Sequence, residues 1–125
     1  MVQWHRRSNR KYTGGKYHQD RKKRKSELGR YSGETRQGET RRKLIRTRGG
    51  NMKARLYQEQ FVNVSTPKGT KRYKILDVLD NPANRNYARR KIMTAGAVIE
   101  TEQGQVRITS RPGQSGVISG ILIEK

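Results

Sequence analysis

Apolar residues are almost missing from the first 43 positions of the chain. Between Lys11 and Lys43 the only aliphatic residue is Leu28, and residues 1–55 hold 19 Lys and Arg against 4 acids. Such a segment buries too little apolar surface to offset the entropy lost when a chain becomes ordered. We therefore predict that residues 1–43 form a basic arm that is extended or disordered without a partner.

The pattern changes at Leu44, where short apolar segments begin to alternate with turn residues. This spacing is typical of an all-β domain with short strands. A small closed or partly open β-barrel suits residues 44–125, because closure removes exposed sheet edges. We predict about six strands, at residues 44–47, 55–64, 73–79, 97–101, 105–109 and 117–123.

Turn residues mark the connections between these strands. Arg48–Asn51 and Thr66–Gly69 read as turns, and Glu102–Gly104 reads as the turn of a β-hairpin. Pro82 suits the first position of a short helix over residues 82–91 capped by Asn81, with a loop as the alternative.

The charge of the chain indicates the class of its partner. The formal net charge is +20 and the isoelectric point is near 11.1, so a polyanion is the expected ligand. The chain has no cysteine and therefore no disulfide or thiolate metal site. No apolar run is long enough for a membrane span or a secretory signal. We expect a soluble protein that is retained in the cell and has no membrane partner.

The more basic part of the chain, residues 1–55, offers three features suited to RNA. The run Arg21–Lys25 can follow a phosphate backbone, with a solvated tail or a localisation signal as the alternative. The glycine pairs Gly14–Gly15 and Gly49–Gly50 let the main chain approach phosphates, although the second pair equally suits a hairpin turn. Trp4 and three tyrosines can stack on unpaired bases or can instead cover apolar surface of the barrel.

Residues 81–91 concentrate cations and amide side chains, and we interpret them as the main RNA-facing patch of the barrel. Arg111 lies in a polar loop, residues 110–116, that either meets RNA or merely connects two strands. The expected RNA-binding set consists of the cations of both parts and one tryptophan: Trp4, Arg6, Arg7, Arg10, Lys11, Lys16, Arg21, Lys22, Lys23, Arg24, Lys25, Arg30, Arg41, Arg42, Lys43, Arg46, Arg48, Arg85, Arg89, Arg90, Lys91 and Arg111.

The sequence offers little for catalysis. His5 and His18 lie 13 residues apart without clustered carboxylates, and the acids occur mostly singly. Metal-dependent hydrolysis requires a cluster of such ligands. We therefore expect no catalytic residue, metal site, cofactor or small-molecule substrate.

Ordered blocks along nearly the whole chain resemble one family, the archaeal and eukaryotic small-subunit ribosomal protein family eight-e. The most specific blocks are Trp4, Arg7–Ser8, Arg10–Gly15, Arg21–Arg30, Arg42–Leu44, Arg46, Arg48–Asn51, Ile75–Leu79, Asn81–Arg85, Gly96–Thr101 and Thr109–Gln114. The short length resembles archaeal members. Met52 departs from the pattern, since family members are more basic at this position.

The resemblance implies a β-barrel with a basic N-terminal extension, bound to small-subunit rRNA. It also implies a structural role in the 30S subunit during translation, a location in the cytoplasmic ribosome, and neighbouring small-subunit ribosomal proteins as partners. A free RNA-binding factor or chaperone of similar build is the main alternative. An RNA-modifying or RNA-cleaving enzyme is a third class, for which the sequence offers no site.

Overall fold

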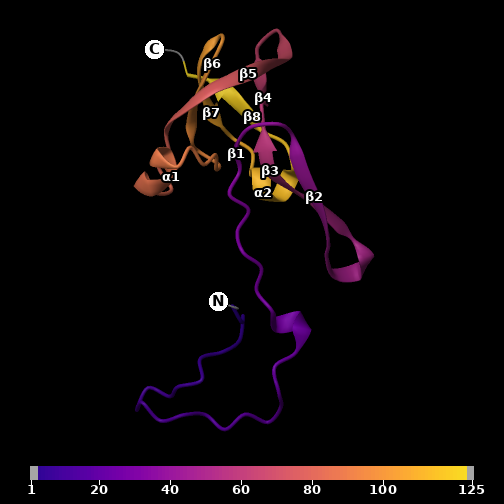
Figure 1. The fold of residues 1–125 in the computed structure, drawn as a ribbon, viewed down its shortest axis with the longest axis vertical. Helices are drawn as coiled ribbons and strands as arrows, with labels where there is room; N and C mark the ends of the chain where they lie inside the picture. Colours follow the sequence, from indigo (N-terminus) through magenta and orange to yellow (C-terminus); the bar gives the residue numbers. More distant parts are fainter. Residues whose placement is uncertain (1–2, 124–125) are drawn as a thin grey trace. The chain divides into compact units, whose positions relative to one another are not determined.

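The computed structural model describes residues 3–123 and divides the chain into two compact units, with the boundary between Ser32 and Gly33. We call them the N-terminal unit and the C-terminal unit and describe each by itself. The C-terminal unit holds every β-strand of the described residues (Figure 1). No helix within residues 3–123 is long and apolar enough to cross a membrane.

A closed five-stranded barrel forms most of the C-terminal unit. Its strands are labelled in Figure 1. Its strands follow one another in chain order around the barrel. The closing pair β4·β8 is parallel and the other pairs are antiparallel. The strands are β4 Phe61–Thr66, β5 Gly69–Asp80, β6 Val98–Thr101, β7 Gly104–Ile108 and β8 Ser119–Leu122. The predicted all-β barrel is confirmed.

The core of the barrel follows from the alternation of side chains along each strand. Val62 and Val64 of β4 are fully buried, whereas Phe61 and Asn63 face outward and are half-buried. Ile75, Ile99 and Ile108 complete the interior from three other strands. Each such side chain contributes about 1.5 to 3 kcal/mol on burial, so the domain depends on a few aliphatic residues.

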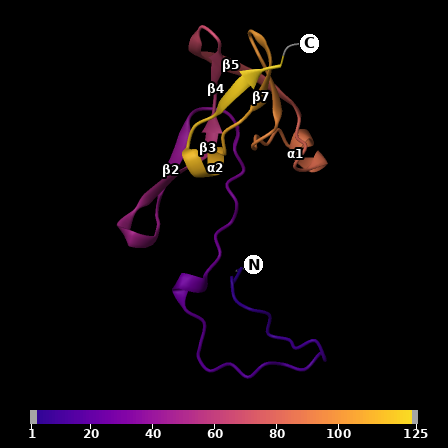
Figure 2. The ribbon, with the colours of Figure 1, turned by 180° about the vertical axis from the view of Figure 1, so that it is seen from behind.

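A second sheet, with strand order β1-β3-β2, lies before the barrel in the sequence. β2 (Arg41–Arg46) and β3 (Met52–Glu59) form a hairpin through the 3-10 turn η2 (Arg48–Gly50). β1 (Arg36–Gln37) pairs in parallel with the end of β3. The helix α2 (Pro112–Ser115) packs against β3, and Figure 2 shows this side of the unit.

The boundary between the units lies eleven residues before the position after Lys43 where the apolar pattern begins, because residues 33–43 contact the folded domain. Thr35 is buried, its hydroxyl donates to the Leu56 carbonyl at 2.7 Å, and its carbonyl accepts from the Met93 amide at 2.8 Å. Arg36 forms a bridge to Ile92. Backbone pairing therefore holds this basic segment although it has few apolar side chains.

One predicted strand, residues 55–64, is wrong, because it is two strands that belong to different sheets. β3 ends at Glu59, β4 begins at Phe61, and Gln60 lies between them with its carbonyl accepting from the Ile75 amide at 2.8 Å. The apolar pattern continues through Gln60 because both strands contribute to one core. The apolar pattern therefore does not indicate that the chain leaves one sheet at Glu59 and enters another at Phe61.

Residues 82–91 contain a short helix, but its cap differs from the expected one. α1 spans Arg85–Arg89, and Asn84 is its N-cap, accepting from the Asn86 amide at 2.9 Å. Asn81 is buried instead. Its side-chain amide donates to the Ile92 carbonyl at 2.9 Å, and its side-chain oxygen accepts from Thr94 Oγ1 at 2.9 Å. The hairpin predicted at Glu102–Gly104 is confirmed by the pairing of Thr101 with Gly104.

The described part of the N-terminal unit is a loop closed at its base. The 3-10 turn η1 (Lys25–Glu27) is its only helical element among residues 3–32. An antiparallel bridge joins Trp4 to Leu28, and the His5 amide donates to the Glu27 carbonyl at 2.8 Å. Most of this segment has no helix or strand, and its two ends pair with each other.

Candidate nucleic-acid interface

Cations and aromatic rings share the surface of the N-terminal unit. Lys23 Nζ lies 5.3 Å from the centre of the Trp4 ring, and the Arg7 guanidinium lies 4.2 Å from that of Tyr17. Trp4 remains 37% exposed and Tyr12 is fully exposed. Rings that are accessible and bordered by positive charge suit stacking on unpaired bases next to phosphates.

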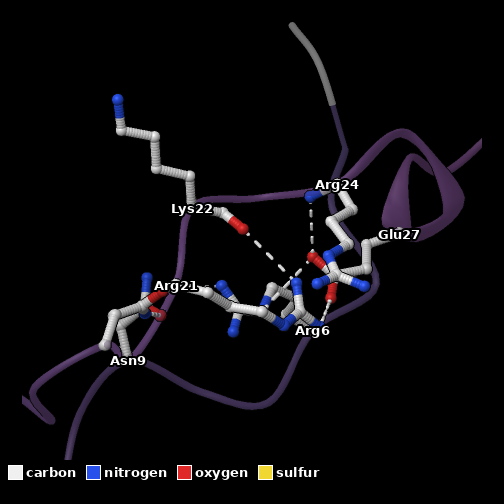
Figure 3. Close-up of polar contacts among 7 residues, drawn as sticks. Arg6, Asn9, Arg21, Lys22, Arg24 and Glu27 are labelled. Atoms are coloured by element: carbon white, nitrogen blue, oxygen red, sulfur yellow. Dashed lines mark hydrogen bonds and ion pairs between the residues drawn. The ribbon is translucent and has the colours of Figure 1, made fainter.

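One carboxylate organises the charges of this unit. Glu27 accepts from the Arg21 guanidinium and, at 3.2 Å, from the Arg24 amide, while Arg6 Nε lies 3.4 Å away (Figure 3). The hydrogen bond from Arg21 is the main reason that the pKa of Glu27 is lowered. The five cations of the run Arg21–Lys25 are therefore not equivalent, because Arg21 is held by Glu27.

The β2–β3 hairpin brings cations together that are distant in sequence. Lys43 lies directly opposite Arg55, and Lys53 lies opposite Ile45. Like charges placed opposite each other on antiparallel strands destabilise the pair, so a bound polyanion would stabilise this hairpin. Sequence reasoning included Lys43 but missed Lys53 and Arg55, because only the strand register identifies these neighbours.

Five of the predicted cations are exposed on this hairpin: Arg41, Arg42, Lys43, Arg46 and Arg48. Gly49 and Gly50 adopt φ angles of 71° and 73° in the connecting turn. The hairpin-turn interpretation of this pair is confirmed, and the approach of its backbone to a phosphate stays a prediction.

The patch predicted around α1 is assembled in the structure, but half of its cations have acidic partners. Arg90 Nη2 lies 2.5 Å from Glu34, and Lys91 Nζ lies 2.7 Å from Asp77. The pKa values of both carboxyls are lowered, that of Glu34 mainly by a hydrogen bond from Arg36 and that of Asp77 mainly by one from Lys91. Within the described residues, Arg85 and Arg89 are the exposed cations of the patch without an ion pair.

Arg111 directly precedes α2 and is exposed. Its carbonyl accepts from the Gln114 and Ser115 amides, each at 2.9 Å. Its backbone thus begins a short helix within the segment that the sequence indicated as a loop. The side chain points away from the core and adds to the positive surface of the unit.

Glu59 is the buried acid of the C-terminal unit. Its side chain is 3% exposed, Thr40 Oγ1 donates to it at 2.7 Å, and Arg42 Nη2 donates at 2.9 Å. Arg72 Nη2 lies 3.7 Å from the same carboxylate. Burial raises the pKa of Glu59, but the hydrogen bonds from Thr40 and Arg42 outweigh it and leave the pKa lowered.

The predicted set is thus divided between the two units, with residues 4–30 in one and residues 41–111 in the other. The structure brings together the hairpin cations and the cations around α1 as two groups in the C-terminal unit. Among residues 3–123, no group of three or more His, Asp or Glu side chains is placed to hold a metal ion.

Comparison with known proteins identifies the family. The model of the family described as ribosomal protein S8e matches residues 4–123. A protein of Nanoarchaeum equitans is 54% identical over 120 residues, covering 94% of each chain, and one of Methanospirillum hungatei is 50% identical over 125 residues, covering 98% of this chain and all of the relative. A Methanoculleus marisnigri protein is 47% identical over 124 residues, which cover 98% of this chain and 99% of the relative. All three are named small ribosomal subunit protein eS8. The chain therefore belongs to the ribosomal protein S8e family.

Proposed function

We propose that the protein is a structural constituent of the small ribosomal subunit that binds and stabilises small-subunit rRNA and thereby serves translation in the cytoplasm. The observation that carries this proposal is the family match over residues 4–123, together with full-length relatives of that name. The protein acts as a scaffold component and not as an enzyme.

RNA binding rests on both units. The cations of residues 6–30 and the hairpin β2–β3 contact phosphates, and Arg85 and Arg89 extend this surface next to α1. Trp4 stacks on an unpaired base. The net charge of +20 supports the proposal, because phosphate contacts and counterion release supply most of the affinity of such proteins.

Neighbouring ribosomal proteins are the second class of partner. Leu44 and Met52 are 65% and 66% exposed on the β2–β3 hairpin. Strand register places them on one face, since Leu44 lies opposite Ala54 and Met52 opposite Arg46. Two large apolar side chains on one exposed face suit a contact with another protein.

Stoichiometry distinguishes a structural constituent of the subunit from the alternative, a free RNA-binding factor. A structural constituent is present once in each purified small subunit and remains bound through high-salt washing. A transient factor is substoichiometric and accumulates in the soluble pool. Quantitative mass spectrometry of purified subunits measures the ratio directly.

A triple variant tests how much the N-terminal unit contributes to rRNA binding. It combines Lys22→Gln, Lys23→Gln and Lys25→Gln and leaves the Arg21–Glu27 pair intact. Titration of small-subunit rRNA at several salt concentrations is the measurement. The log-log salt slope should fall by about 0.7 for each phosphate interaction that the substitutions remove, or about 2 in total.

The matched control removes the same charge from exposed positions outside the proposed interface, by Lys68→Gln, Lys71→Gln and Arg107→Gln. Equal slopes for the two triple variants would mean that binding depends on net charge alone, and would overturn the proposed interface.

A further inference from the structure

A surface pocket lies beside β4 and shares Arg42 with the cations of the β2–β3 hairpin. Its volume is about 160 Å³, and its lining includes Arg42, Glu59, Phe61, Asn63, Arg72 and Val117. These residues come from the end of β3, from β2, β4 and β5, and from the segment before β8. All of them belong to the C-terminal unit.

Two guanidinium groups are held at this pocket by a single buried acid. The carboxylate of Glu59 accepts from Arg42 Nη2 at 2.9 Å, with Arg72 Nη2 at 3.7 Å. The arginine side chains are nevertheless 46% and 59% exposed. Each guanidinium carries five N–H donors, so donors remain for an anion after the contact with Glu59. The local charge of this group is +1.

The rest of the pocket supplies an apolar surface and one amide. The Arg72 guanidinium lies 4.2 Å from the centre of the Phe61 ring, and Val117 lines the pocket at its exposed side. Register places Asn63 directly opposite Arg72 across β4 and β5. Asn63 is half-buried and lines the pocket, so its carboxamide supplies a hydrogen-bond donor and an acceptor at this surface.

We propose that this pocket binds one unpaired nucleotide of small-subunit rRNA, which deepens the function proposed above and rests on it. Arg42 and Arg72 bind the phosphate, because guanidinium forks match phosphate oxygens. The base enters the pocket against Val117 and the Arg72–Phe61 stack. Asn63 binds the polar edge of the base, since a carboxamide offers a donor and an acceptor side by side.

The chemistry favours a nucleotide over an acidic segment of a protein. An acidic side chain engages only the two arginines and makes no use of the Asn63 amide or of the apolar surface. A nucleotide uses the positive charge, the apolar wall and the amide together. Glu59 acts as a positioning residue, because it holds the arginines and is itself covered.

Two variants remove the contacts separately, each with a matched control on the exposed face of β7. Arg72→Gln is compared with Arg107→Gln, and Asn63→Leu with Gln105→Leu. The full chain is titrated with in vitro transcribed small-subunit rRNA of an archaeal relative. Dimethyl sulfate probing of the same complexes reports which base edges the protein protects, and thermal melts verify folding.

We expect Arg72→Gln and Asn63→Leu to weaken binding at least about fivefold relative to their controls. Arg72→Gln should also lower the salt slope by about 0.7, whereas Asn63→Leu should leave it unchanged because the amide meets a base. In the probing experiment, one unpaired nucleotide loses its protection in Asn63→Leu, and the other protections persist.

Unchanged protections and affinities within twofold of the controls would overturn the nucleotide site. Normal binding to naked rRNA combined with poor incorporation into subunits reconstituted with the other proteins would also overturn it, assigning the pocket to a protein partner. Failure of the wild-type chain to bind rRNA saturably would instead refute the proposed function.

Discussion

Three glutamates, Glu27, Glu34 and Glu59, each contact two arginine side chains. In a chain with three times as many cations as acids, these carboxylates bring together arginines that would otherwise repel each other. Exposed ion pairs add little to stability, because solvent screens them. Glu59 differs because it is buried, and its carboxylate accepts hydrogen bonds from Thr40 and Arg42 there.

We predict that Glu59→Gln lowers the free energy of unfolding by about 1.5 to 3 kcal/mol at pH 7, the range for hydrogen bonds to a charged group. The pKa of Glu59 in the folded state lies below its ordinary value of 4.5. The stabilisation is therefore fully present above pH 4.5 and is lost as the pH falls through the lowered pKa. Urea denaturation at pH 7 and at about pH 3 measures the loss of stability at neutral pH and its decrease at acidic pH.

Glu102→Gln is the control, because Glu102 lies exposed in the β6–β7 turn. It should change stability little at either pH. A Glu59→Gln deficit of equal size at neutral and acidic pH would show that the ionised carboxylate is not what stabilises the fold.

Gly50 and Gly116 have the same φ of 73° but different surroundings. Substituting each by alanine therefore distinguishes the cost of backbone strain from the cost of overpacking. A Cβ on Gly116 would lie 2.6 Å from the Ala54 Cβ, whereas one on Gly50 would meet nothing within 4 Å. Gly50→Ala should cost about 1 to 2 kcal/mol for the left-handed conformation. Gly116→Ala should cost about 2 to 5 kcal/mol, because overpacking against β3 is added. Thermal and urea unfolding measure the difference, and equal costs would refute the close contact of α2 with β3.

At the scale of elements, the segment before the hairpin completes the folded domain. β1 pairs with β3, and the buried Thr35 bonds to Leu56 on one side and to Met93 on the other. These contacts are formed largely by backbone groups. They join the three-stranded sheet to the barrel although the segment itself supplies almost no apolar side chain.

We predict that a fragment of residues 33–125 folds, whereas a fragment of residues 44–125 loses cooperative unfolding. The shorter fragment lacks β1 and half of β2, which leaves the paired edges of β3 open and exposes the surface around Leu56. Circular dichroism with thermal melting compares the two. Equal melting temperatures would move the boundary of the folded domain to Leu44, where the apolar pattern begins.

At the scale of the whole molecule, the net charge is divided more evenly between the two units than the strands and the core are. Residues 1–32 hold eleven Lys and Arg against two acids, a net +9, and residues 33–125 hold nineteen against eight, a net +11. The strands and the core nevertheless lie entirely after Gly33 among the described residues. The N-terminal unit therefore contributes almost half of the net charge but none of the described strands.

We predict that the fragment of residues 33–125 keeps its fold but binds small-subunit rRNA more weakly, with a salt slope lower by about 0.7 for each phosphate contact that residues 1–32 make. The remaining charge of +11 preserves residual binding. Titration at several salt concentrations measures the slope. A fragment that binds as tightly as the full chain would exclude the N-terminal unit from the interface.

The sequence by itself determined the fold class and the family, and its charge indicated a polyanionic partner. These properties depend on composition, period-two alternation and ordered blocks of residues, and all of these are local or additive along the chain. The β6–β7 hairpin was predictable for the same reason, because a turn of two residues sets its own register.

Only the tertiary structure decided where basic segments join the fold and which cations are neighbours. Arg42 was predicted as a phosphate contact, but its place beside Arg72 and the buried Glu59 depends on the approach of β2, β3 and β5. Phe61 and Asn63 carried no functional signal in the linear pattern. Side-chain pairing across strands depends on register and closure, and these are set by the packing of the whole barrel.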